Sequence, residues 1–198
     1  MNKYLAHSEI IDWRNPSVTL QARTLANGSS DHEIVAERCF TWVRDHIRHS
    51  RDYRIPVVTL SASAVLQHRA GYCYAKAHLL AALLRASGIP AALCYQRLQL
   101  SDSDPRFTLH GLNAVFLPRH GWCRLDARGN KPGVDAQFCP LAERLAFRPT
   151  VSGERDLPGF FAEPLPAIVN VLSRCATEDE VYYALPDYED EPAIKRIV

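Results

Sequence analysis

The chain has 198 residues, of which 47% are hydrophobic and 23% charged, enough for one sizeable core. Its 23 Lys and Arg residues against 22 Asp and Glu residues give a formal net charge of +1, which excludes the overall basic field that attracts nucleic acids or anionic membranes. We therefore expect a single domain over residues 1–198 with no nucleic-acid or membrane partner; the composition leaves the oligomeric state open.

Neither the N-terminus nor the cysteine pattern indicates export. The N-terminal MNKYLAHSEIIDWRNP lacks the apolar core of a signal peptide, and no stretch reaches the ~18 apolar residues of a membrane span. The six cysteines are scattered along the chain, which favours reduced thiols over a disulfide framework. These features predict a cytoplasmic protein.

Helix-start residues precede the apolar runs in the first part of the chain. They are Asn15 with Pro16, Ser30 with Glu33 in the spacing of a capping box, and Ser61. Side chains of these types accept hydrogen bonds from the first N–H groups of a helix. The pattern predicts helices over residues 16–27, 30–49 and 62–68.

The pattern changes beyond Pro90. Short runs with Val, Leu, Phe, Tyr and Trp between turn residues predict antiparallel strands at 91–100, 111–117 and 121–126. A last helix is expected at 167–175. From about residue 178 to 198 the chain is acidic, which predicts a partly ordered surface tail. Helices followed by a meander of strands predict an α+β fold with segregated layers.

Cys73 opens the most apolar helical run, which Gly88 and Pro90 end. The N–H groups and the positive dipole end of a first helical turn stabilise a thiolate, and they can also hold an oxyanion that forms on an attacked carbonyl. However, Cys73 also begins an apolar stripe with Ala77 and Leu80, so a buried structural thiol is the alternative. The position is thus that of a nucleophile or of a core residue.

A thiolate nucleophile needs a base, usually histidine, and a group that orients the base. His78 lies five residues after Cys73 and therefore points away from it on the helix. His110 stands at the start of a predicted strand and is the better candidate. If that strand pairs with the next as a hairpin, Asp126 returns beside His110. The sequence thus brings a thiol, an imidazole and a carboxylate together.

These motifs carry a family resemblance. GYC before LLAALLRASGIPA, then a His before a strand, then GWCRLDA resemble the core of the transglutaminase-like superfamily of papain-type cysteine enzymes, over about residues 40–130. The resemblance implies a papain-like fold in which the cysteine helix packs on an antiparallel sheet. It also implies Cys73 as nucleophile, His110 as base and acid, and Asp126 as the group that orients His110. No acidic loop has calcium-ligand spacing, so no calcium or other cofactor is expected.

Two sets of residues near Cys73 are candidates for binding the substrate. Gln67, six positions earlier, is either a second oxyanion donor beside the backbone N–H of Cys73 or an exposed helix residue. The aromatic side chains are either walls of a cleft or ordinary core. They are Tyr72, Tyr74 and Trp122.

Charged and imidazole groups give weaker signals. Arg128 and Lys131 follow the aspartate and either bind a substrate carboxylate or belong to a solvated turn. His46 and His49 have a spacing that suits a metal, yet no third ligand is near. We expect a solvated helix end there, and no metal.

The expected reaction is acyl transfer through a thioester on Cys73. Hydrolysis of an amide or peptide bond is the first choice, with a peptide, a protein or a small amide as substrate. One alternative is transfer to an amine, as in transglutaminases or arylamine N-acetyltransferases. Another is a non-catalytic module that binds peptides on the same fold.

Overall fold

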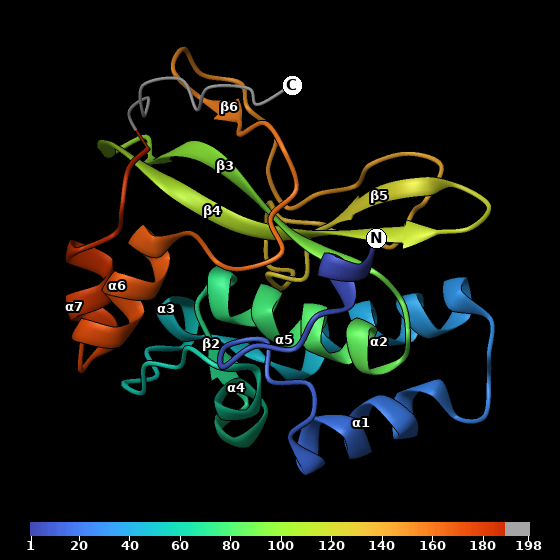
Figure 1. The fold of residues 1–198 in the computed structure, drawn as a ribbon. Helices are drawn as coiled ribbons and strands as arrows, with labels where there is room; N and C mark the ends of the chain where they lie inside the picture. Colours follow the sequence, from blue (N-terminus) through green and yellow to red (C-terminus); the bar gives the residue numbers. More distant parts are fainter. Residues whose placement is uncertain (189–198) are drawn as a thin grey trace, which may run out of the picture.

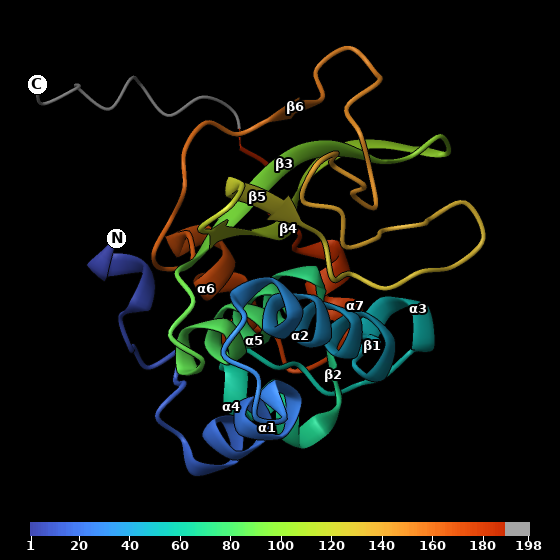
Figure 2. The same cartoon turned by 90° about the vertical axis from the view of Figure 1, so that its right-hand side faces the viewer.

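The computed structural model describes residues 1–188. Helices cover one face of a curled antiparallel sheet (Figure 1), and the turned view shows the same two layers (Figure 2). A short 3-10 helix, Asn2–Leu5, comes first. The other helices are α1 (Pro16–Ala26), α2 (His32–His46), α3 (Ser50–Tyr53), α4 (Ala62–His68), α5 (Cys73–Ala86), α6 (Pro166–Arg174) and α7 (Glu178–Tyr183). The strands are β1 (Arg48–His49), β2 (Ala70–Gly71), β3 (Ala91–Ser101), β4 (Asp104–Leu117), β5 (Gly121–Leu125) and β6 (Arg155–Asp156).

The central helix α5 has no exposed face over most of its length. Every residue from Cys73 to Arg85 is buried, because α1, α2 and α4 pack against α5 while β3 and β4 cover it from the sheet. A helix enclosed in this way is mostly apolar, which explains the run of leucines and alanines. Its buried polar side chains, Lys76, His78 and Arg85, are hydrogen-bonded to backbone carbonyls. Gly88 ends the turn after the helix with φ +74°, in the left-handed region that favours glycine. Because the buried stretch begins at Cys73, the surrounding helices and strands also fix the start of α5.

The four-stranded sheet has the order β5-β4-β3-β6. Strands β3 and β4 form a long hairpin in which Gln96 lies opposite His110, and β4 and β5 form a short one in which Asn113 lies opposite Leu125. The predicted α+β fold, with the cysteine helix packed on an antiparallel sheet, is confirmed. β4 is longer than expected: it begins at Asp104, so His110 lies inside the strand.

Both ends of α2 differ from the sequence prediction. The N-cap of α2 is Asp31 rather than Ser30: its carboxylate accepts hydrogen bonds from the N–H groups of Glu33 and Ile34. The helix ends at His46 instead of continuing to about residue 49, because the chain then enters β1.

The expected acidic tail is folded at its beginning. Residues Glu178–Tyr183 form α7, with Glu178 and Val181 buried. Arg51 holds this helix through ion pairs with Glu178 and Asp179. Residues 189–198 of the predicted tail lie outside the described residues. Within residues 1–188, no helix combines the length and the apolar character needed to cross a bilayer.

Candidate active site

Cys73 is the first residue of α5, and its N-cap, Tyr72, makes no side-chain capping hydrogen bond. The N–H groups of the first turn are therefore not taken by a capping side chain. The chain just before Cys73 is tightly packed, because a Cβ atom on Gly71 would stand 3.0 Å from both Ala75 Cβ and Thr59 Oγ1. Cys73 is 7% exposed and lines a cavity. A rigid helix start thus presents the thiol to a hollow.

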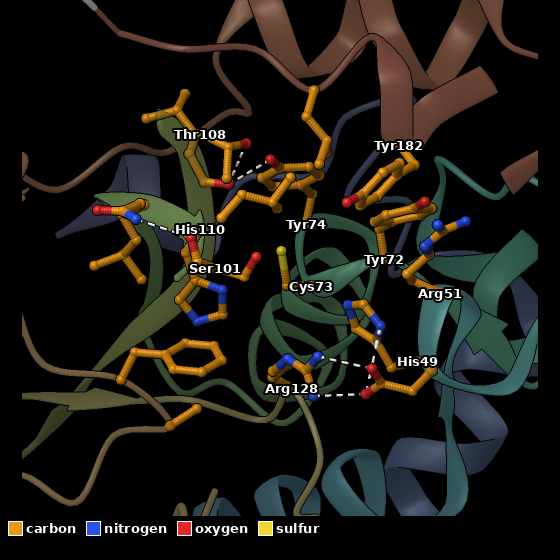
Figure 3. Close-up of a pocket in the computed structure, with 18 of the residues that line it drawn as sticks. His49, Arg51, Tyr72, Cys73, Tyr74, Ser101, Thr108, His110, Arg128 and Tyr182 are labelled. Carbon is orange, nitrogen blue, oxygen red and sulfur yellow. Dashed lines mark hydrogen bonds and ion pairs between the residues drawn. The ribbon is translucent and has the colours of Figure 1, made fainter. Parts of the chain in front are cut away.

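His110 faces Cys73 from β4 (Figure 3). Its Nε2 is hydrogen-bonded to Oδ2 of Asp126 at 2.8 Å, which leaves Nδ1 for the sulfur. The neighbouring backbone N–H of Gly111 donates to Cys73 Sγ at 3.5 Å. The ring of Phe147 packs edge-on against the imidazole, with centroids 5.1 Å apart. The imidazole is thus fixed in position and orientation by its surroundings.

Asp126 follows β5 directly and is fully buried. Besides His110, it accepts hydrogen bonds from the backbone N–H groups of Arg128 at 3.2 Å and Ala146 at 3.1 Å. Burial by itself would raise the pKa of this carboxyl, but the charge of His110 and these hydrogen bonds hold the pKa below its usual value. The carboxylate therefore stays ionised beside the imidazole.

The charge of His110 follows from its neighbours. Burial opposes the charged form, but the negative charges of Asp126 and Cys73, and hydrogen bonds to both, outweigh it and raise the pKa of His110 to about 10. The ring is therefore protonated at neutral pH. An imidazolium between a carboxylate and a sulfur can give a proton to a leaving group and take one back later.

The cavity in front of Cys73, here called the Cys73 cavity, has a volume of about 530 Å³. One wall comes from the C-terminal part of the chain: Tyr182 and Leu185 line it, and the Tyr72 hydroxyl donates to the Glu178 carbonyl at 2.7 Å. Its apolar lining consists of Leu98, Leu100, Leu109, Ala146, Phe147 and Leu185. The volume is in the range of small-molecule and peptide side-chain sites.

Comparison with known proteins identifies the family of the chain. The sequence profile of the Transglutaminase-like superfamily matches residues 19–127, which include Cys73, His110 and Asp126. The chain belongs to the transglutaminase-like superfamily. No curated protein sequence matches the chain.

Solved structures resemble this superfamily member in fold. The candidate cysteine protease from Cytophaga hutchinsonii is 19% identical with a TM-score of 0.50, and the match covers 63% of this chain and 40% of that one. The periplasmic domain of TgpA from Pseudomonas aeruginosa is 20% identical with a TM-score of 0.45, over 57% of this chain and 42% of that one. The chain thus spans less than half the length of each.

The other predicted site residues of this superfamily member divide into two groups. Tyr72, Tyr74 and Arg128 line the Cys73 cavity. Gln67 does not: it is exposed on α4, which packs on the side of α5 away from the sheet. Trp122 is also outside the cavity lining and packs on the rings of Tyr4, Phe116 and Phe160. Of the two expected oxyanion donors, only the backbone N–H of Cys73 lies at the site.

His49 belongs to the site, although the sequence suggested a solvated helix end. The parallel pairing of β1 with β2 sets His49 opposite Gly71, two residues before Cys73, and His49 is 7% exposed. Figure 3 shows it beside Cys73, across from His110. His46, by contrast, is exposed and stacks on Trp42. The two histidines therefore lie in different environments.

An ion-pair cluster stands next to His49. Asp52 binds the guanidinium of Arg128 through two contacts, at 2.6 and 3.0 Å, and Lys131 Nζ at 2.8 Å. Burial and the charge of Arg128 lower the pKa of His49 well below its usual value, so this imidazole is neutral at neutral pH. Asp52 lies on the short helix α3, which the sequence pattern did not predict.

Proposed function

We propose that the protein is a cysteine-dependent acyl-transfer enzyme that hydrolyses an amide or peptide bond, with Cys73 as nucleophile, His110 as acid and base, and Asp126 as the orienting group. The observation that carries the proposal is the position of Cys73 Sγ. It lies at an uncapped helix start, faces an imidazole bound to a buried carboxylate, and opens on a cavity. This combination is what nucleophilic catalysis by a thiolate requires.

The first half of the reaction forms a thioester. The Cys73 thiolate attacks the carbonyl carbon, and the oxyanion is stabilised by the backbone N–H of Cys73 and the positive end of α5. His110 then gives its Nδ1 proton to the leaving nitrogen as the C–N bond breaks. The amine departs and the acyl group remains on sulfur.

The second half releases the acid. His110, now neutral, accepts a proton from water as the water oxygen attacks the thioester carbonyl. Collapse of this intermediate breaks the C–S bond and restores the thiolate and the imidazolium. Asp126 keeps Nε2 protonated and the ring in place in both halves. Attack by an amine in place of water would give acyl transfer, so added primary amine separates these two outcomes by product.

Alkylation with iodoacetamide, followed by mass mapping of all six cysteines, tests the proposal. We expect Cys73 to be modified first at neutral pH although it is buried, because it stands at the start of a helix, faces the imidazole of His110 and opens on a cavity that the reagent can enter. Cys139 and Cys175, which are only partly buried, are internal references. His110→Ala should remove the preference for Cys73. Equal or slower modification of Cys73 would falsify the proposal.

A further inference from the structure

The Cys73 cavity carries more positive charge than the chain as a whole. Apart from the reacting groups, four Lys or Arg side chains and two carboxylates line it, whereas the whole chain has a formal net charge of +1. They are Arg51, Arg128, Lys131 and Arg148, against Asp52 and Glu154. Fields of one sign in a recess select substrates of the opposite sign.

Neither carboxylate is available to a cationic substrate. The carboxylate of Asp52 is already bound by both terminal nitrogens of Arg128 and by Lys131 Nζ. Glu154 accepts the backbone N–H groups of Gln99 at 2.9 Å, Thr150 at 2.8 Å and Val151 at 3.0 Å. Both acids therefore serve to hold the walls of the cavity in place.

The four cations differ in how far their charge is already balanced by carboxylates of the protein. Arg51 is bound to Glu178 and Asp179, and both terminal nitrogens of Arg128 are bound to Asp52. By contrast, the side chain of Lys131 is 42% exposed and shares Asp52 with Arg128, so its charge is only partly balanced.

Arg148 is the second cation with donors to spare. It is exposed and donates to the backbone carbonyl of Glu143 at 3.0 Å. Within residues 1–188 it forms no ion pair. A guanidinium with unused N–H groups is well suited to bind a carboxylate.

We propose that the Cys73 cavity binds substrates that carry a free carboxylate near the scissile bond, and that Lys131 and Arg148 bind this group. The apolar part of the cavity lining would hold the rest of the substrate. The chemical class of substrate is therefore an N-acylated amino acid or the end of a peptide. The inference rests on the proposed function, because it takes Cys73 as the reacting group.

The test uses two alkylating reagents of nearly equal size, neutral iodoacetamide and anionic iodoacetate. The rate of Cys73 modification by iodoacetate is divided by its rate with iodoacetamide, and the same ratio is measured at Cys175. The division removes effects on the reactivity of the sulfur itself. We expect the ratio at Cys73 to exceed that at Cys175 and to fall as salt is added, since salt screens the cations.

Variants assign the effect to the two cations. Lys131→Gln and Arg148→Gln should each lower the ratio at Cys73 by about threefold or more. Lys131→Arg keeps the positive charge and should show the wild-type ratio. Arg119→Gln is the matched control: it removes a cation that is 74% exposed at the β4–β5 turn and should leave the ratio unchanged.

Two results would overturn the inference. One is an unchanged ratio in both Gln variants; the other is an equal fall in Arg119→Gln, which would indicate net charge alone. In either case, fast reaction of Cys73 with iodoacetamide would leave the proposed function intact. Slow reaction with both reagents would instead remove the proposed function, so the two failures are distinguishable.

Discussion

Gly111 lies directly against Tyr74: a Cβ atom at position 111 would stand 2.9 Å from Cδ1 and 3.1 Å from Cα of Tyr74. The Tyr74 hydroxyl also donates to the carbonyl of Leu109 on the same strand. Because β4 comes this close to the first turn of α5, the Gly111 N–H reaches Cys73 Sγ and His110 stands beside it. The absence of a side chain at position 111 therefore sets the spacing between thiol and imidazole.

Gly111→Ala should impair the site more than the fold. The methyl group must push β4 away from Tyr74, which we expect to lower the free energy of unfolding by about 1–3 kcal/mol. Since a misplacement of about 1 Å can reduce a rate about 100-fold, the alkylation rate of Cys73 should fall at least about tenfold. Both quantities can be measured on one preparation.

Val18→Ala is the control for lost stability alone. Val18 is fully buried on α1, away from the Cys73 cavity, and its truncation should lower stability by about 1–3 kcal/mol as well. The alkylation rate of Cys73 in the Val18→Ala variant should stay at the wild-type value. Equal rates in the two variants would show that the close approach at Gly111 does not position the site.

The pKa of His110 should depend on both of its charged neighbours. Cys73→Ala removes one of the negative charges that raise this pKa to about 10, so the pKa should fall. Asp126→Asn should lower it further, because Asp126 raises the pKa of His110 more than Cys73 does. NMR titration of the ring protons measures this, with Cys175→Ala as the control. An unchanged pKa in both site variants would contradict the ion-pair arrangement.

Asp126→Asn should also slow the reaction. An Asn at this position offers a single acceptor oxygen, whereas Asp126 receives His110 and two backbone N–H groups. The ring of His110 would lose its orientation, and we expect turnover to fall by about 10²–10⁴-fold. Asp135→Asn, an exposed carboxylate on the following loop, is the control. Turnover near the wild-type level in Asp126→Asn would remove Asp126 from the mechanism.

Lys76 is a buried lysine one turn after Cys73, and Nζ donates to the carbonyls of Ile47 and Arg44 at the end of α2. Burial, with the charge of Arg128, lowers its pKa from 10.5 to about 7. Between these two values the unfolded chain holds more protons than the folded one, so stability should rise with pH across this window.

Lys76→Met removes this pH dependence. The gain in unfolding free energy between about pH 7 and pH 10 should be smaller in the variant by at most about 4 kcal/mol. Urea denaturation at the two pH values measures it, and Lys3→Met, at an exposed lysine, is the control. The same gain in wild type and Lys76→Met would show that Lys76 stays charged when buried.

The parts of the site that the sequence predicted depend on local patterns. Gly88 and Pro90 mark the end of α5, and the turn before Gly121 fixes the hairpin of β4 and β5. In the observed register Asn113 lies opposite Leu125, so that Asp126, one residue on, comes level with Leu112, two residues from His110 and on the same side of the sheet. These relations span few residues, so composition and spacing are enough to find them.

The parts that were missed depend on long-range contacts. His49 reaches the site only because β1 pairs with β2, and Phe147 because a long irregular segment folds back on His110. Gln67 was placed by counting back from Cys73, but Arg69 adopts a left-handed φ of +54° that ends α4. The chain changes direction at Arg69, so the number of residues between Gln67 and Cys73 does not predict how far apart they lie.

The division between the reacting groups and the cavity walls has an evolutionary consequence. Cys73, His110 and Asp126 stand on α5, β4 and the end of β5, within the superfamily match. Much of the facing wall comes from residues 128–154 and 182–185, beyond it. Mutations in those segments can therefore change which molecules enter while the proposed reacting groups stay in place. Transplanting such loops between relatives is therefore a route to new selectivity on an unchanged reaction centre.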